Sequence, residues 1–364
     1  TPMKKFESKQ GGKDMKRSIQ TVFALTAAVG LLASASVTAL AAGMPAAVQK
    51  LIPAAVKEAE ATVFGTTMNP RQVKMMNAGF NSFYGTKIKL NQIGGRHTRK
   101  RVEVIRALKN QVPTGLDIFW TSSPRALING NAIVKFNWAK EFGLSKDLMQ
   151  GEYGIKTHDS YLTMVTINTK LVKAGDEPRT YDDLLKPKWK GKIAMPRSPS
   201  PWIYFSYAFG EEKAVMYLNT LLKQQNVKKL PRYPDVRSRI IAGEFSVGLG
   251  TEAWAEIRKG APVKHPNMDK VILAARGAYI VKDSKSPNIA KLWGYWVVSP
   301  SGQKTIHDVR GYSLINTRTG DMYKYVQGKK VIDVPFDWRM KNEARLGKKF
   351  RSILRGKKKK SQKK

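Results

Sequence analysis

The segment from Thr180 to Pro196, TYDDLLKPKWKGKIAMP, constrains the fold more than any other part of the chain. Thr180 is predicted to N-cap a short acidic helix over Tyr181–Leu185, and the proline two residues later ends that helix. A turn that a tryptophan anchors and Gly191 closes then leads into a buried strand from Ile193 to Met195. The span therefore predicts a complete helix–turn–strand unit of a folded domain.

The amino-terminal residues carry the pattern of an export signal. No charged residue occurs from Ser18 to Gln49, two basic residues precede this run, and its centre from Val22 to Leu32 is apolar. Ala39-Leu40-Ala41 offers a small-x-small cleavage site, so residues 1–41 are predicted to be a signal peptide and the mature protein to be extracytoplasmic, in the periplasm. Because the run is long enough to span a bilayer, an uncleaved membrane anchor is the alternative.

Length and charge bound the rest of the chain. The roughly 320 residues after the signal exceed what one compact core organises, so two lobes are expected. The chain has no cysteine, and its formal net charge is +38. An anionic ligand, an anionic membrane or nucleic acid, and adaptation to acid surroundings compete as explanations for this charge. Adaptation is preferred for the scattered charge, and nucleic acid is not expected as a partner, because basic and aromatic residues do not alternate.

Part of the charge is concentrated at the carboxyl end. Residues 341–364 hold twelve basic residues against the single acidic Glu343. Such a segment is predicted to be a disordered basic tail. Binding of polyanions through this tail is one of the competing functions.

The chain alternates helices and strands in an order that predicts parallel α/β sheets. The expected elements of the first half are a helix over Pro45–Glu60, a strand over Ala61–Gly65, a helix begun by Asn69 and Pro70, a strand over Lys87–Gln92, a basic helix, and a strand over Leu116–Trp120. Tyr161–Thr169 is predicted to enter a second lobe, and Val271–Val281 to return to the first. The predicted lobes comprise residues 42–157 plus 276–305 and residues 158–275 plus 306–340.

Eight short segments, taken in order and spacing, resemble one protein family. They are Ala54–Thr67, Phe80–Gly85, Asp117–Thr121, Ile167–Val172, Thr180–Pro196, Ala242–Glu244, Ser286–Leu292 and Ser299–Gln303. The chain resembles the extracellular solute-binding proteins of ABC importers (family 1), in the ferric-ion-type branch of the type II periplasmic binding proteins. This resemblance implies a two-lobed α/β fold joined by a two-strand hinge, transport rather than catalysis, an ABC permease as partner, a monomer, and no cofactor.

Ligands of open parallel sheets bind beyond the carboxyl ends of the strands, and this rule selects four loops. The candidate ligand-binding residues in these loops are Thr66, Thr67, Ser122, Ser123, Ser198, Ser200, Trp202, Tyr204, Thr251 and Glu252.

Each of these candidates has a structural alternative. Ser198 and Ser200 suit an oxyanion at a helix start, or a simple N-cap. Trp202 and Tyr204 suit stacking on an organic ligand, or core packing. Glu252 suits an amine or a cation, or the first turn of a helix.

The resemblance also implies which residues would hold ferric ion. Met68 stands where the iron-binding relatives have a His, Ser122 where they have a Glu, and Thr251–Trp254 lies around their Tyr pair. Because Fe(III) prefers anionic oxygen ligands, a small organic anion or a chelated metal fits better than the bare ion, which stays the alternative.

Other motifs are weaker. The four histidines show no metal-ligand spacing, so no metal site is predicted. Gly94-Gly95 followed by Arg96, His97 and Arg99 is either an anion-facing loop or, preferably, the solvated start of a basic helix. An enzyme on the same two-lobed scaffold is a further alternative, but the chain has no Gly-x-Ser-x-Gly, His-Glu-x-x-His, phosphate-binding Walker loop or paired-carboxylate motif. The chain is therefore predicted not to be an enzyme.

Overall fold

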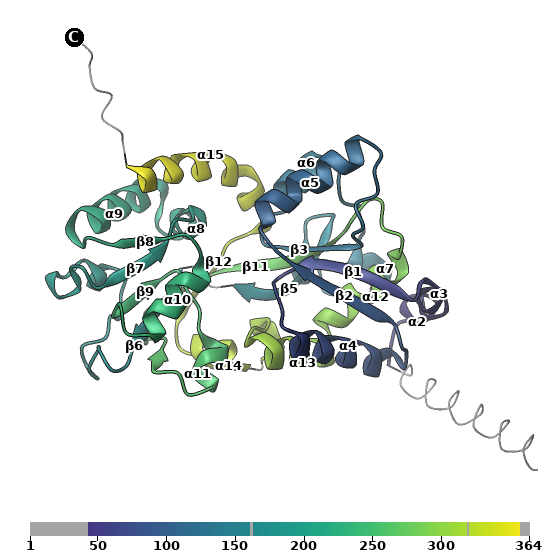
Figure 1. The fold of residues 1–364 in the computed structure, drawn as a ribbon, viewed down its shortest axis with the longest axis horizontal. Coiled ribbons are helices and arrows are strands. Elements are labelled where there is room, and N and C mark those ends of the chain that lie inside the picture. Colours follow the sequence, from purple (N-terminus) through teal and green to yellow (C-terminus); the bar gives the residue numbers. More distant parts are fainter. Residues whose placement is uncertain (1–42, 161–162, 319, 357–364) are drawn as a thin grey trace, which may run out of the picture.

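The computed structural model describes residues 43–160, 163–318 and 320–356, which form two lobes (Figure 1). The predicted signal peptide over residues 1–41 and its cleavage site lie outside the described residues. Within the described ranges, no helix combines the length and the apolar character needed to cross a bilayer. Each lobe has its own β-sheet flanked by helices, as the predicted two-lobed α/β class requires.

The sheet of the first lobe has a parallel half and an antiparallel half. Its strands, in spatial order, are β2 (Lys89–Gly94), β1 (Glu60–Gly65), β3 (Ile118–Thr121), β11 (Lys270–Ile280), β5 (Gly154–Ser160) and β4 (Met149–Gln150), with β12 (Lys330–Asp333) on β11. β1 pairs in parallel with β2 and β3, which confirms the predicted strand–helix alternation of the first half. β11 runs antiparallel to β3 and β5 because it returns from the second lobe.

The helices of the first lobe enclose an aromatic core. They are α2 (Ala46–Gln49), α3 (Ile52–Glu58), α4 (Pro70–Tyr84), α5 (His97–Lys109), α6 (Arg125–Asn129), α7 (Trp138–Phe142), the 3₁₀ turn η1 (Lys146–Leu148), α12 (Pro287–Val298) and α13 (Pro300–Arg310). Asn69 begins α4 with a capping box, because its side chain accepts from the Gln72 N–H at 2.9 Å and the Gln72 side chain accepts in return at 3.1 Å. Trp120, Trp293 and Trp296 are fully buried beneath these helices.

The second lobe contains the segment 180–196. Its sheet has the order β10 (Val263–Lys264), β6 (Val165–Asn168), β9 (Val247–Leu249), β7 (Ile193–Pro196) and β8 (Lys228–Leu230). The predicted acidic helix is a 3₁₀ turn, η2 (Asp182–Leu185), in which the Thr180 hydroxyl accepts from the Asp183 N–H at 3.2 Å and the Asp183 carboxylate accepts from the Thr180 N–H at 2.9 Å. The predicted buried strand is β7, whose four residues are all buried.

Helices cover the second sheet and extend to the carboxyl end. They are the 3₁₀ turns η3 (Pro187–Trp189) and η4 (Ile315–Thr317) and the helices α8 (Ser200–Phe209), α9 (Glu211–Gln224), α10 (Tyr233–Ile241), α11 (Trp254–Arg258), α14 (Gly320–Val326) and α15 (Phe336–Arg355).

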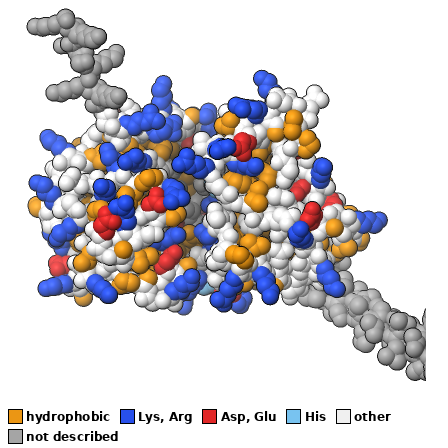
Figure 2. Space-filling view, viewed as in Figure 1, with side chains coloured by type: hydrophobic (Ala, Val, Ile, Leu, Met, Phe, Trp, Pro, Cys, Tyr) orange, Lys and Arg blue, Asp and Glu red, His pale blue; other side chains and the backbone are white. Residues whose placement is uncertain are grey.

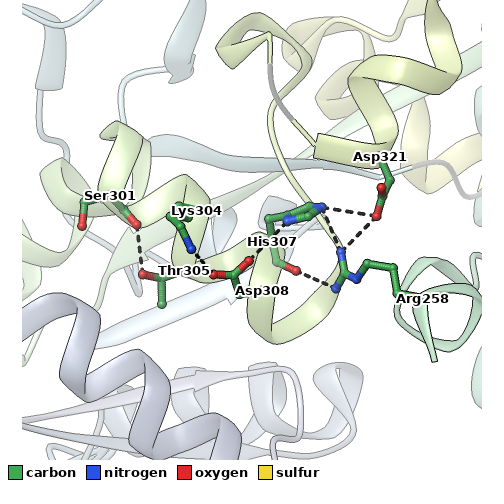
Figure 3. Close-up of polar contacts among 7 residues, drawn as sticks. All are labelled: Arg258, Ser301, Lys304, Thr305, His307, Asp308 and Asp321. Atoms are coloured by element: carbon green, nitrogen blue, oxygen red, sulfur yellow. Dashed lines mark hydrogen bonds and ion pairs between the residues drawn. The ribbon is translucent and has the colours of Figure 1, made fainter.

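The chain crosses between the lobes after β5 and again along β11, as the hinge prediction requires. A polar cluster beside these crossings also joins the lobes (Figure 3). Arg258 of α11 donates to the His307 carbonyl of α13 at 2.9 Å and to the Asp321 carboxylate of α14 at 3.0 Å. The residue bounds given above for the two lobes stay a prediction.

Residues 341–355 contradict the prediction of a disordered tail, because they belong to α15. Leu346, Phe350 and Leu354 follow at intervals of four, so they share one helix face, and all three are buried in the core of the second lobe. The Glu211 carboxylate binds Arg345 at 2.6 Å and Lys349 at 2.6 Å on the exposed side. Residues 357–364 of the predicted tail lie outside the described residues.

We expect Phe350→Ala to lower the free energy of unfolding by about 3–5 kcal/mol, because it leaves a cavity under α15. The exposed neighbour Lys348 offers a control, and Lys348→Ala should change stability by less than about 0.5 kcal/mol. Urea unfolding followed by tryptophan fluorescence measures both variants. Equal small effects would mean that α15 contributes nothing to the folded core.

Candidate functional site

A cleft of about 1720 Å³ lies between the two lobes, and the space-filling view shows the surface hollowed there (Figure 2). Its walls include the loops after β1, β3, β7 and β9, which are the four loops that the sequence selects. Eight of the ten predicted residues line it: Thr66, Thr67, Ser122, Ser123, Ser198, Ser200, Thr251 and Glu252. The structure thus brings residues from widely separated loops into one cavity.

Trp202 and Tyr204 do not line this cleft. Trp202 is 3% exposed and Tyr204 is 5% exposed, and both lie in the core of the second lobe. The Trp202 ring lies 5.9 Å from that of Phe205 and 6.2 Å from that of Tyr217. The prediction that these two rings stack on a ligand is therefore wrong, and core packing is what the structure shows.

The start of α8 offers hydroxyl groups more than backbone donors. The Ser200 N–H donates to the Ser198 side chain at 3.3 Å, and the Trp202 N–H donates to the Pro199 carbonyl at 3.1 Å. Pro201 between them has no N–H group. An anion at this helix start would therefore meet the hydroxyls of Ser198 and Ser200 together with the helix dipole.

The loops of the first lobe are held by neighbouring elements. The Ser123 hydroxyl donates to the Glu343 carboxylate of α15, and the Ser122 carbonyl accepts from Arg339 at 2.9 Å. Thr67 lies against Gly94 at the end of β2. A Cβ atom at Gly94 would lie 2.5 Å from the Thr67 Cα, so only glycine lets these two loops approach so closely.

Glu252 connects the lobes. Its carboxylate accepts a hydrogen bond from the Ser160 hydroxyl of β5 at 3.4 Å, and its carbonyl accepts from Arg237 of α10 at 3.1 Å. Both of these partners also line the cleft, so Glu252 lies at the junction of the two lobes on the cleft wall.

Arginine dominates the charge of the cleft. Among the described residues that line it, nine are arginine and none is lysine, although the chain contains 20 Arg and 45 Lys. Three glutamates offset part of this charge and leave an excess of six positive charges. The planar guanidinium group binds carboxylate and phosphate through paired hydrogen bonds, which lysine cannot do. The arginines are Arg96, Arg99, Arg101, Arg106, Arg232, Arg237, Arg276, Arg310 and Arg351.

The sequence prediction included none of these arginines among the ligand-binding residues. Arg96 and Arg99 belong to the Gly94–Arg99 segment, for which a solvated helix start was preferred over an anion-facing loop. In the structure they line the cleft at the start of α5.

Burial holds three histidines neutral. Burial and then the nearby charges of Arg276 and Arg101 lower the pKa of His97 to about 3, and Arg276 donates to its Nε2 at 3.0 Å. Burial, Arg276 and Arg310 lower the pKa of His158 well below its ordinary value. Burial lowers the pKa of His265, in the second lobe, to about 4. Among the described residues, no group of three or more His, Asp or Glu is arranged to hold a metal ion.

We expect the free energy of unfolding to fall as pH is lowered from 7 to 5. Unfolded histidines take up protons near pH 6.5, and the three folded ones do not, so each contributes a slope of up to about 1.4 kcal/mol per pH unit. Burial raises the pKa of Asp159 to about 6, so this one group opposes the trend below pH 6.

Urea midpoints at pH 7, 6 and 5 measure this dependence. In the variant His97→Asn, one proton fewer is taken up on unfolding. The slope of its unfolding free energy against pH should therefore be smaller by up to about 1.4 kcal/mol per pH unit, whatever its absolute stability. An unchanged slope in that variant would contradict the neutral state of His97.

Solved structures of similar fold bind different ligands. Iron-bound HitA from Pseudomonas aeruginosa has a TM-score of 0.64 at 14% identity and covers 80% of this chain and 99% of its own. AfuA from Actinobacillus pleuropneumoniae, with fructose-6-phosphate bound, has a TM-score of 0.60 at 19% identity, with 80% and 97% covered. The ferric binding protein from Campylobacter jejuni has a TM-score of 0.62 at 18% identity, with 81% and 99% covered. At these identities the likeness shows the fold alone.

Sequence comparison with characterised proteins gives no match. The sequence profile of the bacterial extracellular solute-binding proteins, by contrast, matches residues 80–327. This span contains both strand crossings of the hinge and most of the cleft, and it is more than half of the chain. The chain therefore belongs to the bacterial extracellular solute-binding proteins.

Proposed function

We propose that this protein captures a small organic anion in the cleft between its lobes and delivers it to the permease of an ABC importer. The excess of six positive charges on the cleft wall is the observation that carries the proposal. A cleft whose charges have one sign concentrates solutes of the opposite sign and speeds their association. The bound phosphate ester in the structurally similar AfuA supports this class of solute.

Bare ferric ion is the weaker candidate. An excess of positive charge repels a trivalent cation, and the acidic side chains of the cleft already have partners. Glu103 pairs with Arg99 at 2.7 Å, and Glu343 accepts from Ser123. An anionic chelate of a metal remains within the proposed class, because its net charge suits the arginines.

The remaining features of the proposal come from the sequence. The predicted signal peptide supports export to the periplasm, where the protein would act as a monomer without a cofactor. The solute would favour the closed form, because only that form lets both lobes contact it. The bond between Ser160 and Glu252 across the hinge lies where such closure would tighten contacts.

We expect fructose 6-phosphate and citrate to raise the melting temperature and to reduce the radius of gyration of the purified protein. Uncharged fructose provides a matched control, because it differs from the first ligand only by the phosphate. A solute at 100 times its dissociation constant should stabilise the protein by about 2.7 kcal/mol. Thermal melts and small-angle X-ray scattering measure the two effects. Equal responses to fructose and to the anions would contradict the proposal.

A further inference from the structure

Arg276 lies at the floor of the cleft, in the middle of the hinge strand β11. The pairing of β11 with β5 shifts register between Arg276 and Gly277, and such a bulge re-aims the side chain beside it. The Arg276 guanidinium lies 5.6 Å from the Trp120 ring centre and donates to the Trp120 carbonyl at 3.1 Å. The strand register and the buried tryptophan therefore fix its position.

Arg310, the last residue of α13, reaches the same floor. Its guanidinium lies 5.6 Å from the Tyr312 ring centre and donates to the Thr67 carbonyl at 3.1 Å. The Tyr312 ring stacks on His158 at 4.9 Å, with 9° between the ring planes, and His158 is the strand partner of Arg276. We call Arg276 and Arg310 the floor arginines.

The floor arginines have no carboxylate partner among the described residues within ion-pair distance. Every hydrogen bond described above for their guanidiniums goes to a carbonyl or to a neutral imidazole. The Nε atom of Arg276 is buried and has no hydrogen-bond partner in the described part of the chain. Both floor arginines are half-buried, and a cation that is partly removed from water without a counter-ion costs free energy, which an aromatic face offsets only in part.

Burial accordingly lowers the pKa of Arg276 to about 10. His97 and His158, which face Arg276, stay neutral, and the Glu252 carboxylate attracts Arg276 only from beyond ion-pair distance. An oxyanion that enters the cleft could therefore accept a hydrogen bond from the Arg276 Nε–H group, which has no partner among the described residues.

The start of α8 in the second lobe is a separate set of groups for an anion. It presents the hydroxyls of Ser198 and Ser200, and it belongs to the lobe opposite the floor arginines. The cleft volume of about 1720 Å³ exceeds the roughly 300–1,000 Å³ of most small-molecule pockets. An extended solute can therefore contact both sets at once.

We propose that the floor arginines form a second anion-binding centre, so that the solute carries two anionic groups. One group binds the floor arginines of the first lobe, and the other binds the hydroxyls at the start of α8. This inference rests on the proposed function, since it assumes that the cleft holds an organic anion. It goes beyond that function by stating the number and position of the anionic groups.

Fructose 6-phosphate and fructose 1,6-bisphosphate test this inference, because they differ by one phosphate. Isothermal titration calorimetry on the whole protein should show at least tenfold tighter binding of the bisphosphate. Arg276→Gln should reduce that preference to threefold or less, because it weakens binding of the bisphosphate more than binding of the monophosphate. Arg310→Gln should act in the same direction and provides a second variant if the first fails to fold, which circular dichroism checks.

Arg355→Gln is the matched control, because it removes one positive charge from the exposed end of α15. It should keep the full preference for the bisphosphate. An undiminished preference in both floor variants, or no preference in the unchanged protein, would overturn the second centre while leaving the binding of monophosphate intact. Failure of both sugar phosphates and of citrate to bind would overturn the proposed function as well, so the two failures are distinguishable.

Discussion

The long strand β11 is the element on which the rest of the structure depends. Its eleven residues place side chains in the cores of both lobes: Ile272 and Ala274 pack in the second lobe, and Ala278 and Ile280 pack in the first. β3 and β5 pair with the part of the strand that belongs to the first lobe. Because β11 packs in the cores of both lobes, Arg276 between these two ends is held at the wall of the cleft.

Local patterns in the sequence were sufficient to predict most of the scaffold. The reciprocal bonds of Thr180 with Asp183, and of Asn69 with Gln72, involve residues three apart, so their spacing is visible in the sequence. The prediction of a disordered basic tail failed for a physical reason. In α15 the many lysines hid the four-residue spacing of Leu346, Phe350 and Leu354, which is the signal of a helix that packs on a core.

The cleft shows where such reasoning stops. The strand-end rule located eight lining residues, but it failed for Trp202 and Tyr204, because residues 201–206 of α8 are all buried in the core of the second lobe. Four of the nine arginines, Arg96, Arg99, Arg101 and Arg106, lie in or beside α5, but no local pattern links them to Arg276 and Arg310, which come from elements far away in the sequence. One signal was available: Arg276 is the only charged residue within the apolar run from Val271 to Val281, and such a residue must face a partner or a cavity.

The position of α15 restricts how the cleft can close. Its first turns are bonded to the first lobe, because the buried Arg339 donates to the Ser122 carbonyl and to the Gln150 side chain at 2.7 Å. Its later turns are attached to the second lobe by the packing of Phe350 in the core and by the ion pairs of Arg345 and Lys349 with Glu211. Breaking the bonds of a buried guanidinium is costly, so closure that keeps them is favoured. The lobes should therefore turn about an axis near α15 and β11. This rotation would bring the start of α8 toward the floor arginines and keep the hydrogen bonds of Arg339 to the first lobe.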